Sequence, residues 1–246
     1  MNKVIVPATA AALSLFDIAA AMGADLLPVG GPLPVDAAPV PAWTGFYIGV
    51  HGGVRAEFSD VSGALPVGNP FAAQLDPLTG LGGGHAGYNL QILPLTLIGL
   101  EGSTSWGRSK KSASFVRLQV FDGVTFSNGG AISVDHDWDA TFRARAGFLV
   151  TSTTLLYAAG GVSFLNEKIT ENADIALGGG WSQTNTRVGW TLGGGVESLL
   201  TEHWLVRAEY LYADYGAHNY SGGAIPVSLQ ISTQTHTGRA GLTYKF

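Results

Sequence analysis

From Trp43 onward, apolar residues of this sequence alternate with small or polar residues over unusually long stretches. Successive side chains of a β-strand point to opposite faces, so this alternation predicts strands with one apolar and one polar face. In the first stretch one face carries Phe46, Ile48, Val50, Gly52, Val54, Ala56 and Phe58, and the other carries Tyr47, Gly49, His51, Gly53, Arg55 and Glu57. Soluble sandwich strands rarely keep such a pattern so long, whereas a strand that crosses a membrane needs about 9–11 residues. The pattern is therefore typical of membrane-spanning strands.

Seven later segments are also interpreted as strands, near residues 82–91, 98–106, 138–148, 156–164, 187–197, 204–212 and 239–246. Six of them repeat the alternation, and the segment near 156–164 is more apolar on both sides. Short connections near 92–94, 150–153 and 200–203 alternate with long ones near 59–80, 107–135, 166–186 and 216–234. An even number of strands, with short periplasmic turns and long outer loops, characterises bacterial outer-membrane barrels. We therefore predict an all-β fold over residues 43–246, an eight-stranded antiparallel up-and-down transmembrane β-barrel in the cell outer membrane.

The composition agrees with a barrel and excludes several other classes. Glycine supplies 35 residues and charged residues only 13%, yet no apolar run after residue 24 approaches the roughly 18 residues of a membrane helix. A closed ring of strands pairs every backbone group without such a helix. The net charge of −5 and the lack of a basic stripe argue against a nucleic-acid partner. Since there is no cysteine, thiolate metal sites and disulfides are excluded.

The N-terminal region predicts export from the cytoplasm. Residues 1–23 combine Lys3 with a mostly apolar, alanine-rich stretch, as in a secretory signal peptide. Cleavage is expected before Ala24, and cleavage after Ala21 fits almost as well. The alternative is an apolar helix that stays attached. Residues 24–42 contain five prolines and are interpreted as an extended periplasmic leader rather than as part of a core.

Several short motifs resemble a known family. They are residues 43–49 (WTGFYIG), 87–91 (GYNLQ), 99–102 (GLEG), 156–162 (LYAAGGV), 187–191 (RVGWT) and 207–212 (RAEYLY). In this order they resemble the small porin-family barrels of alphaproteobacteria, often called outer-membrane immunogenic or surface-antigen proteins. The resemblance implies an eight-stranded outer-membrane barrel. It also implies that Leu242, Tyr244 and Phe246 form the terminal signal that the barrel-assembly machinery reads. Members of this family are described as structural envelope proteins, surface antigens, small pores or haem binders.

The polar faces of the strands carry charges that would point into the barrel. The cations are Arg55, Arg143, Arg145, Arg207, Arg239 and Lys245, and the anions are Glu57, Glu101, Glu197 and Glu209. Eight strands enclose a space that side chains just fill, and buried charges are costly unless they are paired. Counting from the short turns predicts the pairs Glu197–Arg207, Glu101 with Arg145 or Arg143, and Glu209–Arg239. These pairs would make a polar plug; the alternative is a water-filled lumen lined by unpaired charges.

No catalytic or cofactor site is predicted. Residues 82–87 satisfy G-x-G-x-x-G, but a dinucleotide site needs a preceding strand and a following helix, which the pattern does not offer. Asp135, His136, Asp137 and Asp139 are interpreted as a solvated polar rim rather than as a cation site. We expect no resident cofactor and no metal.

The expected function is that of a non-enzymatic structural or surface-antigen protein with exposed loops. Its expected partners are outer-membrane lipid and lipopolysaccharide, together with the barrel-assembly machinery. The alternatives are a narrow porin-like pore and a haem-binding outer-membrane protein, for which His136 and His218 in the predicted outer loops would be candidate ligands. A soluble ligand-binding barrel is disfavoured because it would hide apolar residues, not charges, in its interior.

Overall fold

The computed structural model describes residues 43–64, 70–75, 78–121, 124–173, 181–222 and 227–246. The chain divides into two units, residues 1–38 and residues 39–246. The signal peptide predicted over residues 1–23 and the leader predicted over 24–42 lie outside the described residues, so both stay predictions. The described residues contain no helix with the length and apolar character needed to cross a membrane.

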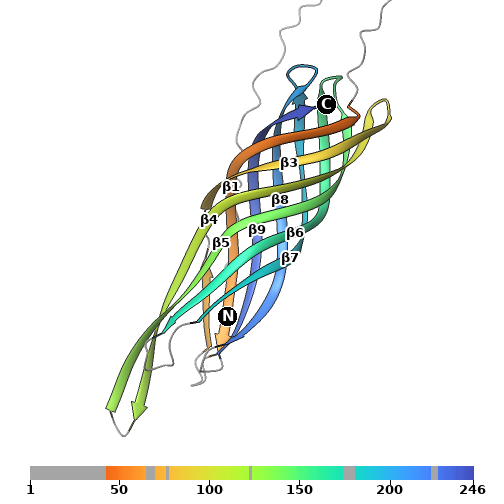
Figure 1. Ribbon diagram of the computed structural model, residues 1–246. Coiled ribbons are helices and arrows are strands. Elements are labelled where there is room, and N and C mark those ends of the chain that lie inside the picture. Colours follow the sequence, from red (N-terminus) through yellow and green to blue (C-terminus); the bar gives the residue numbers. More distant parts are fainter. Residues whose placement is uncertain (1–42, 65–69, 76–77, 122–123, 174–180, 223–226) are drawn as a thin grey trace, which may run out of the picture. The chain divides into compact units, whose positions relative to one another are not determined.

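The described part of residues 39–246 is a closed antiparallel β-barrel. Its strands are β1 (Gly45–Ala64), β2 (Pro70–Leu75), β3 (Leu78–Leu93), β4 (Thr96–Phe121), β5 (Val124–Leu149), β6 (Thr154–Ala173), β7 (Trp181–Leu199), β8 (Trp204–Gly222) and β9 (Val227–Lys245). Each strand from β3 to β9 pairs with its neighbour in sequence, and β1 closes the ring by pairing with both β3 and β9. The predicted eight-stranded barrel is thus confirmed, and Figure 1 shows its strongly tilted strands.

The long connections differ from the expectation, because much of their length is strand and not loop. The pairing of β4 with β5 continues out to Phe121 and Val124, through most of the segment read as a loop over 107–135. The short strand β2, which was not expected, pairs with residues 59–64 of β1. Antiparallel partners can keep exchanging backbone hydrogen bonds beyond the membrane, where their side chains need no apolar face. The β4–β5 hairpin is the longest of these extensions (Figure 1).

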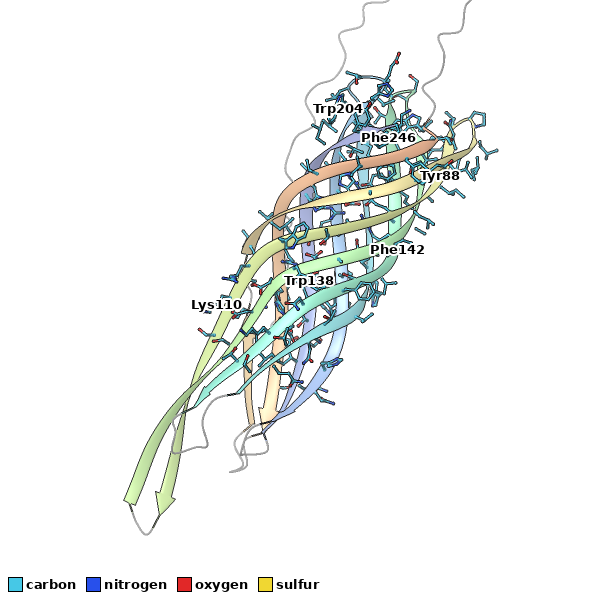
Figure 2. The ribbon with its side chains drawn as sticks, viewed as in Figure 1. Tyr88, Lys110, Trp138, Phe142, Trp204 and Phe246 are labelled. Carbon is cyan, nitrogen blue, oxygen red and sulfur yellow. The ribbon has the colours of Figure 1, made fainter. Side chains whose placement is uncertain are left out.

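The two faces of the wall are the reverse of those in a soluble protein. On β1, Phe46 and Val50 expose 67% and 64% of their surface, while Arg55 exposes 2% and Glu57 exposes 1%. Figure 2 shows Tyr88 and Phe142 on the outside of the wall, with Trp204 and Phe246 near the short turns. Exposed apolar and buried charged side chains are favourable only where the surroundings are lipid. The charged side chains of the described strands therefore point mainly into the lumen.

Candidate functional site: the polar lumen

The lumen contains a dense group of buried charges that we call the central belt. Its members are Glu101 on β4, Arg143 and Arg145 on β5, Glu197 on β7, Arg207 and Glu209 on β8, and Arg239 on β9. All seven come from the polar face of a strand whose other face is apolar, which is why the alternation directs them to the same space. They are the residues that the sequence proposed as an interior ion network.

Glu101 connects opposite walls of the barrel. Its Oε2 lies 2.8 Å from Nη1 of Arg207, although β4 and β8 lie four strands apart in the closed ring of eight strands. The same carboxylate contacts Arg143, and it lies 3.3 Å from Nη1 of Arg145. Tyr47 donates a hydrogen bond of 2.9 Å to Glu101 from β1. Side chains from β1, β5 and β8 therefore meet at the Glu101 carboxylate.

Glu209 forms the second centre of the belt. Its carboxylate accepts hydrogen bonds from Nε of Arg239 at 2.6 Å, from Nη1 of Arg143 at 2.9 Å and from Nη2 of Arg207 at 3.1 Å. Tyr157 on β6 donates to the same carboxylate at 3.0 Å. Shared acceptors of this kind satisfy several buried donors at once, which low-dielectric surroundings require.

Glu197 is bound mainly by Arg145, with 2.9 Å between Nη2 and Oε2. Its separation from Arg207, the partner proposed from the turn geometry, is longer at 3.7 Å. Counting residues gives the height of a side chain on the wall but not the direction in which a long guanidinium reaches across the lumen. The other proposed contacts, Glu101 with Arg143 or Arg145 and Glu209 with Arg239, lie within hydrogen-bond distance.

Two tyrosines complete the belt and were missed by an inspection of charges alone. The Cζ atom of Arg145 lies over the Tyr157 ring, 4.0 Å from the ring centroid. The Tyr157 hydroxyl accepts a hydrogen bond from Arg207 at 2.7 Å. Tyr47 accepts from Arg145 at 3.0 Å. For Tyr47 the signal was its place on a polar strand face, because an inward tyrosine needs a hydrogen-bond partner. Tyr157 had no such signal, since Leu155 and Ala159 share its face of β6.

A histidine pair occupies the lumen beside the belt. The Nδ1 atoms of His51 and His85 lie 3.4 Å apart, and His85 Nε2 lies 2.8 Å from the hydroxyl of Thr243. Both rings fit because the wall next to them is glycine. A Cβ added at Gly83 would lie 2.7 Å from His51 Nε2, and one at Gly49 would lie 2.5 Å from His85 Nε2. Glycine in these strands therefore makes room for inward rings.

A second group of charges, the outer cluster, lies nearer the long hairpins and beyond the paired Trp106 and Trp138. It comprises Glu57, Lys111, His136, Glu167 and Arg187. Lys111 Nζ lies 3.0 Å from Glu57, and Arg187 Nη1 lies 3.2 Å from Glu167. His136 contacts both carboxylates, with 2.9 Å between its Nε2 and Glu167.

The structure corrects the interpretation of the acidic segment at residues 135–139. His136 is fully buried in the lumen and not part of a solvated rim, and Asp139 points inward to Arg55 at 2.7 Å. A bulge in the pairing of β5 with β6, between His136 and Asp139, changes the inside–outside alternation here. Asp137 keeps to the exposed surface, where it binds Arg108 at 3.0 Å, and Asp135 is half-buried. Because the residues around the bulge are polar, the sequence does not show this shift in the alternation.

The environment of His136 favours its charged form. Burial by itself lowers the pKa of His136, but hydrogen bonds and charges from Glu167 and Glu57 outweigh burial and raise that pKa above its ordinary value. Each carboxylate also has a permanent cationic partner, because Lys111 contacts Glu57 and Arg187 contacts Glu167. Within the described residues, no three histidine, aspartate or glutamate side chains are grouped to hold a metal ion.

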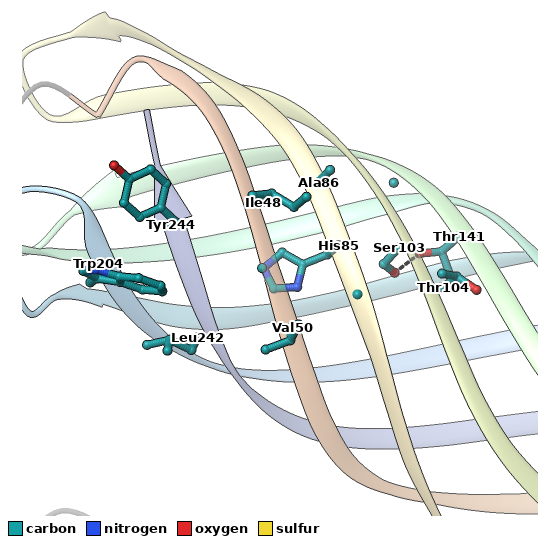
Figure 3. Close-up of a pocket in the computed structure, with 13 residues that line it drawn as sticks. Ile48, Val50, His85, Ala86, Ser103, Thr104, Thr141, Trp204, Leu242 and Tyr244 are labelled. Carbon is teal, nitrogen blue, oxygen red and sulfur yellow. Dashed lines mark hydrogen bonds between the residues drawn. The ribbon is translucent and has the colours of Figure 1, made fainter.

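The C-terminal residues lie on the lipid face near the short turns. Leu242 and Phe246 are exposed, and the ring of Tyr244 packs 5.2 Å from those of both Trp204 and Phe246. Figure 3 shows Leu242, Tyr244 and Trp204 beside Ile48 along a shallow apolar depression of the outer wall. Aromatic rings at this level are typical of the membrane interface. Their role as an assembly signal stays a prediction.

Comparisons with known proteins agree with this geometry. Residues 8–246 match the family model described as the outer membrane protein beta-barrel domain. The chain is 31% identical to the 31 kDa outer-membrane immunogenic protein of Brucella melitensis over 100% of both chains, and 30% identical to the 25 kDa protein of that organism over 87% of this chain and 84% of the relative. The crystal structure of OprG from Pseudomonas aeruginosa resembles it with a TM-score of 0.49 and 15% identity, over 82% of this chain and 96% of that one.

Three findings indicate the family of this chain. They are the apolar outer and charged inner face of the wall, the closed ring of eight strands, and the family match over residues 8–246. This chain belongs to the outer-membrane β-barrel family that includes the Brucella outer-membrane immunogenic proteins, and it resides in the cell outer membrane.

Proposed function

We propose that this protein is a non-enzymatic envelope protein, whose barrel is a closed anchor and whose hairpins are displayed at the cell surface. In this proposal the lumen is a structural core made of polar groups and is not a passage for solutes. The apolar wall contacts outer-membrane lipid and lipopolysaccharide, and the barrel-assembly machinery inserts the chain. The immunogenic relatives fit a protein with surface-exposed segments.

The contact between Glu101 and Arg207 carries this proposal. It joins β4 to β8 across the lumen at 2.8 Å, and Arg143 on β5 reaches Glu209 on β8 at 2.9 Å. Because an eight-stranded barrel leaves room only for side chains or one small ligand, these contacts between opposite walls support a lumen without a continuous channel of ion size. The narrow pore is the competing proposal, and it requires these contacts to open.

Single-channel recording in planar bilayers distinguishes the two functions. The refolded wild-type protein is expected to give no steady conductance. The double variant Glu101→Ala/Arg207→Ala removes the cross-lumen contact and is expected to give brief openings, whereas Glu202→Ala in an exposed short turn is the matched control and should behave as the wild type. A large and steady conductance from the wild type would reject the closed anchor in favour of the pore.

The haem alternative has less support from the placement of the histidines. His136 is enclosed between Glu57 and Glu167, whereas His218 is exposed on β8. His51 and His85 face each other inside the lumen, next to the central belt. A haem would need an accessible histidine beside an apolar cleft. None of these four histidines combines accessibility with such a cleft.

A further inference from the structure

The central belt contains one more positive than negative charge. It has four arginines and three glutamates, and none of the seven exposes more than 5% of its surface: Arg143, Arg145, Arg207, Arg239, Glu101, Glu197 and Glu209. The two tyrosines of the belt do not supply a further negative charge, because Tyr47 and Tyr157 donate hydrogen bonds to these carboxylates and are therefore protonated. An uncompensated charge in surroundings of low dielectric is costly. The belt therefore needs one further anion to be neutral.

The other described charges of the lumen do not compensate the belt. Asp139 is already paired with Arg55 at 2.7 Å. In the outer cluster, two carboxylates are matched by a lysine and an arginine. The histidine pair beside the belt adds no negative charge in either protonation state. The excess positive charge is therefore confined to the central belt.

The excess charge is located at Arg239. Its Nε lies 2.6 Å from Glu209, but among the described residues no carboxylate lies within hydrogen-bond distance of its Nη1 or Nη2 atom. Glu101 is 3.9 Å from Nη2. In each of the other three arginines of the belt, an Nη atom lies 2.9 Å or less from a carboxylate oxygen. Arg239 is thus the arginine whose terminal nitrogen atoms are least compensated.

Small polar groups surround these two nitrogen atoms. Both Nη atoms lie 3.4 Å from Oγ of Ser103, and Nη1 lies 3.4 Å from Nε2 of His51, which are long distances for hydrogen bonds. Ser103 is joined to Thr141 at 2.8 Å, as Figure 3 shows. When Thr141 is the donor of that bond, the Ser103 hydroxyl hydrogen is available to another acceptor. Arg239 and Ser103 together therefore offer N–H and O–H donors to one small acceptor.

From the excess charge of the belt and the contacts of Arg239, we propose that the lumen holds one small monovalent anion of the halide class. The two Nη atoms of Arg239 and the hydroxyl of Ser103 bind it. The anion neutralises the belt and gives the guanidinium a charged acceptor. A bulky anion is excluded, because eight strands leave room only for side chains or one small ligand. The site concerns a resident ion, so it holds whether or not the lumen conducts.

Chloride is the probe that tests the site. The barrel is refolded into phospholipid vesicles in sodium chloride or in sodium gluconate at equal ionic strength, and unfolding by urea is measured in each salt. Gluconate is the bulky anion that the lumen excludes. A ligand that binds only the folded state lowers the unfolding equilibrium constant, by about tenfold for each tenfold rise in chloride above its dissociation constant. Equal unfolding in the two salts would overturn the proposal.

The variant Arg239→Gln locates the effect. It removes the excess charge, while Glu209 keeps its contacts with Arg143 and Arg207. We expect this variant to unfold equally in the two salts. Lys168→Gln removes a cation from the exposed surface and is the matched control, which should keep the chloride dependence of the wild type. A dependence that persists in Arg239→Gln, or that disappears in Lys168→Gln, would overturn the proposal in favour of a general salt effect.

A second pair of variants places the negative charge in the protein itself. Ser103→Asp puts a carboxylate beside both Nη atoms of Arg239, and Ser103→Asn is the control of equal size without the charge. In gluconate, the unfolding equilibrium constant of Ser103→Asp should be at least about tenfold lower than that of Ser103→Asn, because a hydrogen bond to a charged group replaces one to a neutral group. The heat-dependent gel mobility of folded barrels verifies folding. A Ser103→Asp barrel no more stable than Ser103→Asn would show that the belt has no excess positive charge and would overturn the proposal.

Diffraction from crystals of the wild-type protein grown in sodium bromide locates the ion directly. Bromide replaces chloride in the same kind of site and scatters anomalously. We expect one anomalous peak in the lumen, in contact with the Nη atoms of Arg239 and with Ser103. A lumen without a bromide peak, or a peak that contacts other residues only, would overturn the assigned site.

Discussion

Glu101 is the residue on which the central belt depends most. It accepts hydrogen bonds from Tyr47 and from three arginines that come from two other strands. A buried ion pair adds little net stability when it is formed, but removing one partner leaves an uncompensated charge in a medium that cannot solvate it. The belt is therefore more sensitive to single substitutions than to the exchange of all its charges for apolar groups.

The substitution Glu101→Gln is expected to lower the free energy of unfolding by about 3–5 kcal/mol. The physical reason is that Arg207 and Arg145 lose their shared negative partner inside the lumen. Urea titration of the barrel in phospholipid vesicles, followed by tryptophan fluorescence, measures the change. Glu202→Gln in an exposed short turn is the control. A Glu101→Gln barrel as stable as this control would contradict the assigned contacts.

His136 makes stability depend on pH in a direction that the structure specifies. The pKa of His136 is raised in the folded barrel relative to its ordinary value of 6.5, because its contacts with Glu167 and Glu57 outweigh burial. The stabilisation is therefore complete below about pH 6.5 and is lost as the pH rises through the higher folded-state pKa.

The expected result is that the wild-type barrel loses stability as the pH rises above about 6.5, and that His136→Gln shows a much smaller change with pH. Unfolding midpoints in urea, measured at several pH values, report the difference. His218→Gln is the control, since His218 is exposed on β8. Parallel pH profiles for the wild type and His136→Gln would exclude this role for His136.

At the scale of elements, the alternation located the membrane-spanning part of every strand, but it could not give the full strand lengths. Inside the membrane, lipid imposes an apolar face, and the sequence records it. Outside the membrane no such face is required, so the strand extension over residues 107–121 has no periodic signal. The bulge near His136 is invisible for a related reason, because the residues around it are polar and no apolar face is interrupted by the extra residue.

The last residues of β9 give an element-scale prediction about assembly. Phe246, which directly follows β9, exposes 70% of its surface, donates a backbone hydrogen bond of 3.0 Å to Phe46 and packs its ring 5.2 Å from that of Tyr244. Its deletion is expected to reduce the amount of protein in the outer membrane strongly, with little change in the stability of barrels refolded in vitro. Fractionation with immunoblotting measures the amount of protein in the outer membrane, and urea titration measures the stability of the refolded barrel. Normal outer-membrane levels would refute the assembly-signal role of the C-terminal residues.

At the scale of the whole molecule, fold and cellular location follow from features that the sequence repeats eight times. The candidate site follows only in part. Strand faces identified Glu101, Arg207 and Glu209 as inward residues, because side-chain direction is fixed by the backbone. The contacts between distant strands could not be derived from those faces. An arginine side chain is long enough to reach several carboxylates, and the tilt of the strands decides which carboxylates lie near it. The outer cluster was missed since His136 and Lys111 were assigned to a loop.

The proposal of a closed lumen requires opposite walls to be interdependent, and a double-mutant cycle tests this most directly. Unfolding free energies are measured in phospholipid vesicles for the wild type, Glu101→Gln, Arg207→Ala and the double variant. Because Glu101 and Arg207 are in contact across the lumen at 2.8 Å, their effects should be non-additive, with a coupling energy of about 1–3 kcal/mol. Additive effects, within about 0.5 kcal/mol, would show that the two walls do not meet and would contradict the account of a barrel closed from within.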